Sequence, residues 1–218
     1  MILAALLLQA VEPVIPMPPT DPVAIERTFA SDAQRLGQWT AFAKWAHDDA
    51  IIVGRSVINA KTFAEAQDNP PQAIRWWPVE SFRSCDGRTA FNVGGWEDPV
   101  SGEKGRFHTV WVHGEDGWRY IVDIGSRGQE AMADTGGVEI RRASCLNEPE
   151  ARKPAEMLAR RESSDPPRSG SSIDGTLMYR WHLGDDGSKS VTLNLWDGYH
   201  PRQIYRFDMP PPAPEPAQ

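Results

Sequence analysis

A chain of 218 residues is long enough for one well-packed core with an appendage, or for two small domains. Hydrophobic residues make up 40% of it and charged residues 24%, which is typical of a folded globular protein. The net charge of −7 argues against a general nucleic-acid binder, which would carry a basic face. We therefore expect no nucleic acid among its partners.

Residues 1–20 resemble a secretory signal peptide followed by a proline-rich leader. The run MILAALLLQA is apolar, ends in a small residue and is too short to span a bilayer, although no basic residue precedes it. The alternative, a buried N-terminal helix, is disfavoured by Pro13, Pro16, Pro18 and Pro19. We predict a periplasmic or secreted protein whose mature chain has no membrane span.

Residues 23–47 show the spacing of an amphipathic helix with one interruption. Asp21 is a favourable N-cap, and Pro22 is tolerated in a first helical turn. Apolar residues recur at helical spacing before and after Gly37: Ile25, Phe29, Ala33 and Leu36, then Trp39, Phe42, Ala43 and Ala46. The pattern predicts two helices, or one kinked helix.

The sequence predicts an antiparallel sheet from strand-like runs at 50–53, 74–84 and 89–96 and a long hairpin at 104–125. The hairpin turns at 114–117, where Gly and Asp accept positive φ. On its first strand, alternation predicts a face toward the helices and a face away from them: Phe107, Thr109 and Trp111 against Arg106, His108 and Val110. On its second strand it predicts Trp118, Tyr120, Val122 and Ile124 opposite Arg119, Ile121 and Asp123. The fold class is α+β, with the N-terminal helices packed on one face of a curved antiparallel sheet.

The composition changes after the hairpin. Residues 128–172 are rich in Gly, Pro, Ser and charge, and we expect a linker with a brief strand at 138–143 and a short helix at 155–161. Runs at 176–183, 190–196 and 203–207 predict a C-terminal β extension over 173–208. The proline-rich tail 209–218 is too poor in apolar residues to order itself, so we expect its removal to leave stability unchanged.

Two stretches carry a resemblance to a known family: AIERTFASDAQRLGQWTAFAKWAHDDAIIV at 24–53 and GWRYIVDIG at 117–125. Together with the order of elements they resemble the nuclear transport factor 2-like superfamily, whose SnoaL-like and ketosteroid-isomerase-like members share a cone fold. The resemblance covers about residues 22–125 and implies a cone domain over 21–127 that encloses a conical pocket. It also implies a homodimer formed through the sheet. Members include isomerases, dehydratases, hydrolases and non-enzymatic binding or scaffold proteins.

Three side chains are candidates for proton transfer: Asp32, Asp123 and His108. In ketosteroid-isomerase-like enzymes a partly desolvated carboxylate moves a proton next to a carbonyl, and a donor holds the enolate oxygen. Asp32 has the alternative of facing solvent, and Asp123 the alternative of a solvated face or an ion pair with an arginine. A pocket His108 beside Asp123 would form an acid–base pair. The tyrosine donor of the isomerases has no clear counterpart here, so enzyme activity is left open.

An antiparallel sheet that curls over helices leaves a cavity at its open end. We expect Trp39, Trp76, Trp96 and Phe107 to line it, with Arg75 as a polar contact, and a small apolar or aromatic molecule to bind there. The alternative for most of these rings is plain core packing.

The two cysteines, Cys85 and Cys145, fit an oxidising compartment, where they would form a disulfide. The alternative is two buried free thiols. Their spacing fits neither a zinc knuckle nor a CxxC redox site, and none of the 5 histidines has metal-ligand spacing. We expect no metal and no cofactor.

Three functions remain open on these grounds. The first is an exported protein that binds a small hydrophobic ligand or acts as an envelope interaction module. The alternative is a lyase or isomerase-type enzyme that uses a pocket carboxylate and His108 for proton transfer. The third is an assembly protein whose C-terminal strands, within 173–208, pair with a partner. An enzyme requires at least two polar side chains that converge inside the cavity, whereas a binding module requires only the apolar lining.

Overall fold

Helix α1 (Pro22–Leu36) begins at the cap that the sequence predicts. Asp21 Oδ1 accepts a hydrogen bond of 2.7 Å from the Val23 N–H, and Pro22 occupies the first helical position. The helix ends at Gly37, whose φ of 101° suits a residue without a Cβ. Helix α2 (Gln38–Trp45) follows directly, so the kink separates two helices.

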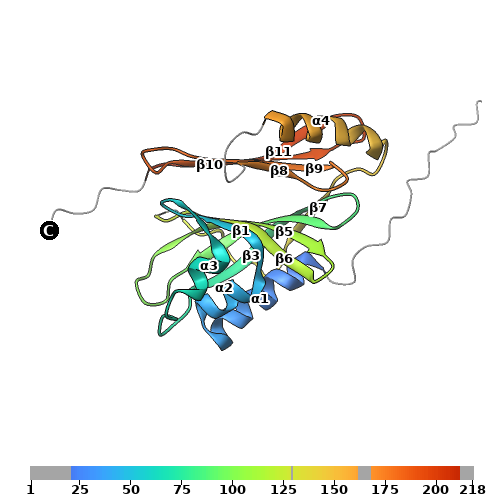
Figure 1. Ribbon diagram of the computed structural model, residues 1–218. Coiled ribbons are helices and arrows are strands. Elements are labelled where there is room, and N and C mark those ends of the chain that lie inside the picture. The colour runs from blue at the N-terminus through green and yellow to red at the C-terminus, as the bar shows by residue number, and fades with distance from the viewer. Residues whose placement is uncertain (1–20, 129, 162–167, 212–218) are drawn as a thin grey trace, which may run out of the picture.

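The computed structural model describes residues 21–128, 130–161 and 168–211, which form four layers (Figure 1). Helices α1, α2 and α3 (Ala60–Glu65) cover one face of a curved seven-stranded sheet, and a four-stranded sheet covers the other face. Helix α4 (Glu148–Arg161) lies on the outer side of that second sheet. The predicted α+β fold is confirmed.

The main sheet has the order β2-β1-β6-β5-β4-β3-β7. Its strands are β1 (Ala46–Val53), β2 (Val57–Asn59), β3 (Arg75–Arg83), β4 (Thr89–Glu97), β5 (Lys104–Gly114), β6 (Gly117–Gly125) and β7 (Glu139–Arg142). The predicted antiparallel sheet is present, but two of its strand pairs are parallel: β1 with β6 and β3 with β7. These parallel pairs join segments that are far apart in the sequence. Local turn and alternation patterns predict pairs only between neighbouring strands, so they do not predict these two pairs.

The second sheet has the order β11-β10-β9-β8 and is antiparallel throughout. Its strands are β8 (Ser169–Ser171), β9 (Leu177–Leu183), β10 (Lys189–Trp196) and β11 (Pro201–Met209). The segment predicted as a linker is more ordered than expected, since α4 begins at Glu148 and β8 lies where we expected a loop. Residues 1–20 and most of the predicted tail lie outside the described residues. Met209, assigned to that tail, is buried, so that boundary was wrong.

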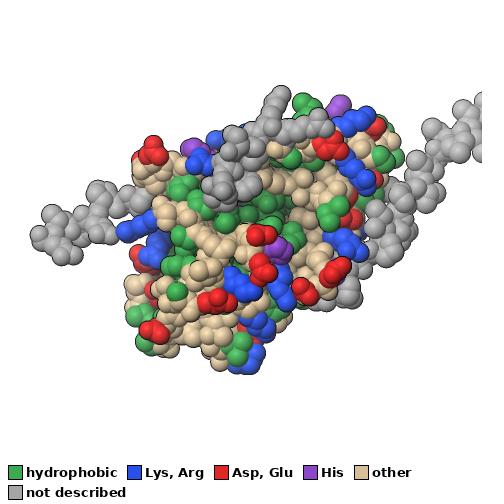
Figure 2. Space-filling view, viewed as in Figure 1, with side chains coloured by type: hydrophobic (Ala, Val, Ile, Leu, Met, Phe, Trp, Pro, Cys, Tyr) green, Lys and Arg blue, Asp and Glu red, His purple; other side chains and the backbone are tan. Residues whose placement is uncertain are grey.

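Two cores lie on opposite faces of the main sheet. The core between helices and sheet is rich in rings, including Phe29, Phe42, Trp76, Trp111 and Tyr120. The core between the two sheets is mainly aliphatic, with Trp181 and Trp196 as its indoles. In the space-filling view, hydrophobic side chains gather where the layers meet, with charged side chains around them (Figure 2). No helix in the described ranges is long and apolar enough to cross a membrane.

A β-bulge at Ile121 changes the faces of strand β6. Trp111 pairs with Tyr120 but Val110 pairs with Val122, so Ile121 is an extra residue in the ladder. Tyr120 packs in the helix-side core, whereas Ile121 and Val122 both pack in the inter-sheet core. The prediction that Val122 and Ile124 share a face with Tyr120 is therefore wrong. The bulge returns Asp123 to the helix side of the sheet.

The predicted disulfide is present between Cys85 and Cys145, whose Cα atoms are 5.2 Å apart. It joins the turn after β3 to the segment between β7 and α4. A nearby hydrogen bond of 2.8 Å, from the Cys85 N–H to Thr176 Oγ1, also ties that turn to the second sheet. A disulfide that closes a long loop stabilises the fold by restricting the unfolded chain.

Candidate functional site

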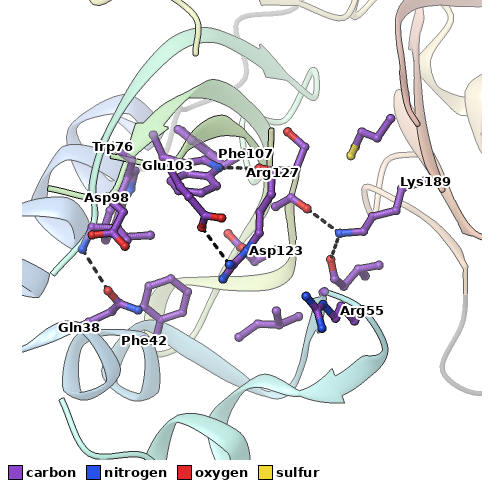
Figure 3. Close-up of a pocket in the computed structure, with 18 of the residues that line it drawn as sticks. Gln38, Phe42, Arg55, Trp76, Asp98, Glu103, Phe107, Asp123, Arg127 and Lys189 are labelled. Atoms are coloured by element: carbon purple, nitrogen blue, oxygen red, sulfur yellow. Dashed lines mark hydrogen bonds and ion pairs between the residues drawn. The ribbon is translucent and has the colours of Figure 1, made fainter. Parts of the chain in front are cut away.

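A cavity of about 340 Å³ opens between the helices and the concave face of the main sheet, near the strands β10 and β11. Its volume is within the range of small-molecule sites. Figure 3 shows Gln38 and Phe42 on the helix side and Lys189 reaching in from the second sheet. The apolar and aromatic lining comprises Phe29, Trp39, Phe42, Ile52, Val53, Ile74, Trp76, Trp96, Phe107, Met209 and Pro210.

The rings of the cavity wall are held by contacts with one another. Phe29 makes edge contacts with Trp76 and Phe42, at centroid distances of 4.8 and 4.9 Å. Gly94 faces Phe107 across β4 and β5, and a Cβ at Gly94 would lie 2.5 Å from the Phe107 ring. The absence of that side chain leaves room for the Phe107 ring beside β4. The wall is therefore built from fixed side chains.

Of the five residues predicted to bind ligand, four line the cavity and one does not. Trp39, Trp76, Trp96 and Phe107 line the cavity, and their role in binding stays a prediction. Arg75 is exposed at the start of β3 and is not part of the lining. Arg75 is adjacent to Trp76, so alternation along the strand turns it to the other face.

Asp123 is the carboxyl group inside the cavity. Thr109, its cross-strand neighbour, donates a hydrogen bond of 2.7 Å to Asp123 Oδ2. Burial raises the pKa of Asp123 to about 6, against the lowering effects of the Thr109 hydroxyl and the Lys189 charge. Within the described part of the chain, Asp123 Oδ1 has no hydrogen-bond partner. That oxygen is free to accept a hydrogen bond from a ligand.

Gln38, the first residue of α2, supplies a donor to the same cavity. Its Oε1 accepts a hydrogen bond of 3.0 Å from the Ile74 N–H, which fixes the orientation of the amide. Its Nε2 makes no hydrogen bond to any residue that the structure describes. The sequence does not single out Gln38, because a glutamine at a helix start has no chemical signature of its own.

Lys189 closes the cavity from the second sheet. Its Nζ donates to the carbonyl oxygens of Val53, at 3.1 Å, and Gly125, at 2.6 Å (Figure 3). Burial lowers the pKa of Lys189 to about 8, although the Asp123 charge acts in the opposite direction. Sequence analysis missed Lys189 because it lies in the C-terminal extension, for which no contact with the cavity was expected.

Charged side chains near the cavity mouth are engaged with other groups. Arg127 and Glu103 form an ion pair of 3.0 Å, and both side chains are well exposed. Asp98 accepts hydrogen bonds from the Val100 N–H and the Ser101 hydroxyl. Exposed pairs of this kind contribute little to stability. They place charged side chains around the mouth of the cavity.

Asp32 lies away from the cavity and is buried between α1 and α2. It accepts hydrogen bonds from Lys44 at 2.5 Å, Arg35 at 2.6 Å and Trp45 Nε1 at 3.0 Å. These donors, the Lys44 ammonium above all, lower the pKa of Asp32 to about 2. The alternative of a solvent-facing Asp32 is also wrong. Its geometry is that of an interhelical ion pair.

His108 faces the other side of the main sheet and is fully buried. Its Nε2 lies 2.9 Å from the Tyr205 hydroxyl on β11, and burial lowers the pKa of His108 to about 3. The second sheet covers the face of β5 that carries His108, so the side chain is buried there and is not exposed at a rim or surface. The proposed acid–base pair is also excluded here, since His108 and Asp123 point to opposite faces.

Glu26 is a buried carboxyl group that sequence analysis did not identify. It accepts hydrogen bonds from Trp76 Nε1 at 2.9 Å, Asn92 Nδ2 at 3.1 Å and Trp111 Nε1 at 2.6 Å. Burial raises its pKa to about 7, although these three donors favour the charged form. Because Trp76 lines the cavity, Glu26 fixes one part of the cavity wall from behind.

The described residues include no group of three or more His, Cys, Asp and Glu side chains that could hold a metal ion. The polar side chains that line the cavity include the amide of Gln38, the carboxyl group of Asp123, the amine of Lys189 and the guanidinium group of Arg55. Such a set can bind the polar end of an organic molecule or transfer a proton.

No protein-family model matches the sequence, and no curated protein matches it. Several solved structures are similar to it over about half of its length. One is an NTF-2-like protein of unknown function from Shewanella oneidensis, 16% identical, with a TM-score of 0.39; the match covers 48% of this chain and 95% of that one. Another is a ketosteroid isomerase-like protein from Erwinia carotovora atroseptica, 14% identical, with a TM-score of 0.36 and coverages of 50% and 95%. A protein of unknown function from Pectobacterium atrosepticum is 14% identical, with a TM-score of 0.40 and coverages of 49% and 88%.

The descriptions NTF-2-like and ketosteroid isomerase-like are names within the superfamily that residues 24–53 and 117–125 resemble. With identities of 16% or lower and TM-scores below 0.5, none of these structures assigns an activity to this chain.

Proposed function

We propose that this protein binds a small, largely apolar or aromatic molecule in its cavity and releases it unchanged. The observation that carries the proposal is the pairing of an aromatic wall with two unused polar atoms, Gln38 Nε2 and Asp123 Oδ1. The wall would bury an apolar ring. The two polar atoms would orient a ligand that has one hydrogen-bond acceptor and one donor.

Calorimetric titration with 2-naphthol, an aromatic ring with one hydroxyl, tests the proposal. Trp39→Leu should weaken binding about tenfold, because the indole contributes buried area that leucine only partly replaces. Trp77→Leu is the matched control, since Trp77 is another half-buried indole but does not line the cavity. No heat of binding at millimolar 2-naphthol, or equal losses in both variants, would contradict the proposal. Native mass spectrometry of the purified protein tests independently for a co-purifying ligand.

A second candidate is a lyase or isomerase-type enzyme in which Asp123 transfers the proton. It is favoured by one observation, a desolvated carboxyl group with a free oxygen beside the Gln38 amide donor. Such an enzyme would exchange the acidic hydrogens next to the carbonyl of β-tetralone for deuterium, and NMR would follow the exchange. Exchange that exceeds the buffer rate and disappears in Asp123→Asn would establish this candidate over simple binding.

We also propose a periplasmic or secreted location. The disulfide between Cys85 and Cys145 supports it, because such bonds persist in oxidising compartments. Fractionation of cells that express the full chain, followed by thiol counting on the recovered protein, tests the location. Recovery in the cytoplasmic fraction with two free thiols would refute it.

A further inference from the structure

Lys189 has an environment that differs from that of the other four lysines. Its Nζ is half-buried at the cavity and contacts two backbone carbonyls. Lys44, Lys104 and Lys153 are exposed, and Lys61 is held by Asp48 in an ion pair of 2.6 Å. None of these four lines the cavity. Lys189 is thus the amine that a bound molecule would meet.

The hydrogen bonds of Lys189 fit a neutral amine. A neutral primary amine has two N–H bonds and one lone pair, so two carbonyl acceptors satisfy both donors and leave the lone pair unengaged. The carbonyls of Val53 and Gly125 are these two acceptors. An ammonium group would carry a third N–H, for which the described residues offer no hydrogen-bond partner. Burial favours the neutral form further, because it lowers the pKa of Lys189.

We propose that the cavity takes aromatic or unsaturated aldehydes and ketones, and that Lys189 condenses with their carbonyl carbon to form a reversible imine. This inference rests on the proposed function, and it names the ligand class for the same cavity. The aromatic wall would bind the apolar part of the ligand and bring its carbonyl group to Nζ.

The condensation balances without any further reactant. The Nζ lone pair attacks the carbonyl carbon, the C=O π bond breaks, and a carbinolamine forms. Its hydroxyl leaves as water after it receives a proton, and the nitrogen lone pair forms the C=N bond. Overall, R–CHO, Lys–NH₂ and the protonated carboxyl group of Asp123 give R–CH=NH⁺–Lys, H₂O and the Asp123 carboxylate. Asp123 lines the same cavity and burial raises its pKa, so its protonated form can supply the proton to the leaving hydroxyl. The protonated imine retains one N–H, which can still bond to the Gly125 carbonyl.

Reductive trapping with cinnamaldehyde tests the inference on the full-length protein. The protein is incubated with cinnamaldehyde and cyanoborohydride at pH 7.5, and peptide mass spectrometry follows labelling at each lysine. A lysine with a pKa near 8 is about one-quarter neutral at this pH, whereas an ordinary lysine is neutral about once in a thousand molecules. We expect Lys189 to be labelled at least about tenfold faster than Lys104 or Lys153, and Lys189→Arg to lose only that fast site.

Cinnamyl alcohol separates this inference from the proposed function, because it has the same skeleton without the carbonyl. Its binding is measured by quenching of tryptophan fluorescence. If the alcohol binds but all lysines are labelled at equal rates, the imine is refuted and ligand binding stands. If the alcohol does not bind and Lys189 is labelled no faster than the other lysines, both the imine and the proposed ligand-binding function are refuted. Fast labelling confined to Lys189 supports the imine. If the cavity binds cinnamaldehyde before the imine forms, the labelling rate saturates with aldehyde concentration.

Discussion

Trp111 on β5 donates its indole N–H to Glu26 on α1 over 2.6 Å, and both side chains are fully buried. The pair joins the helix layer to the main sheet at the centre of the aromatic core. Trp76 Nε1 reaches the same carboxyl group at 2.9 Å, so one acid orients two indoles. A buried carboxyl group that is satisfied in this way still resists ionisation, because burial disfavours its charged form.

This pair predicts a pH dependence of stability. The folded pKa of Glu26 is raised from 4.5 to about 7, so the folded state holds a proton that the unfolded state loses between those values. Stability should therefore fall as pH rises from about 4.5 to 7 and change little above that. We expect Glu26→Gln to reduce the loss between pH 5 and pH 8 by about 2–3 kcal/mol, measured by urea unfolding. Glu115→Gln, at an exposed turn position, is the control. Parallel pH profiles for wild type and Glu26→Gln would contradict the assignment.

Asp32 gives a prediction of opposite sign. Its folded pKa is lowered to about 2, so its contribution is present above about pH 4 and is lost as pH falls through 2. Asp32→Asn should destabilise the protein by about 1 kcal/mol at pH 7, since Lys44 and Arg35 are half-exposed and regain water. The difference should shrink between pH 4 and pH 2. Binding of 2-naphthol should not change, because Asp32 does not line the cavity. If Asp32→Asn lost 2-naphthol binding while it kept the stability of the wild type, Asp32 would belong to the binding site.

The two faces of β5 give a third prediction. Trp111→Ala should cost about 3–5 kcal/mol, since it empties a buried site and removes a donor from Glu26. His108→Ala should cost about 2 kcal/mol, because it removes a buried ring and its hydrogen bond with the Tyr205 hydroxyl. His182→Ala, at an exposed position, is the control. Denaturant unfolding measures all three. A change within about 0.5 kcal/mol for His108→Ala would show that the second sheet does not cover this face.

Much of the first half of the fold can be predicted from local sequence. Asp21, Pro22 and Gly37 mark the start, first turn and end of α1, and each acts through short-range geometry that the sequence displays. The hairpin turn at 114–117 is equally local. These features depend on the residues themselves and on their immediate neighbours.

The candidate site is harder to predict because its residues depend on distant parts of the chain. Nothing in YIVDIG marks Ile121 as a bulge, and this one residue decides that Asp123 faces the cavity. Lys189 reaches the cavity only because the second sheet packs on the first, where it contacts Val53 and Gly125. The same packing of the second sheet on the first buries His108. Alternation gives the two faces of a strand, but it does not say which other layer covers each face.

Met209 gives the last prediction, on the boundary of the C-terminal region. Its side chain is buried and lines the cavity, whereas the sequence placed it in a dispensable tail. A chain that ends at Pro211 should unfold at the same denaturant concentration as the full chain, because it keeps strand β11 intact. A chain that ends at Asp208 should lose about 2 kcal/mol, the approximate value of one buried methionine side chain. Met209→Ala in the full chain separates the side chain from the strand end, and it should lose a similar amount. Equal midpoints for all four proteins would show that Met209 contributes nothing to the core. A large loss on ending at Pro211 would instead show that residues 212–218 stabilise the fold, contrary to their composition.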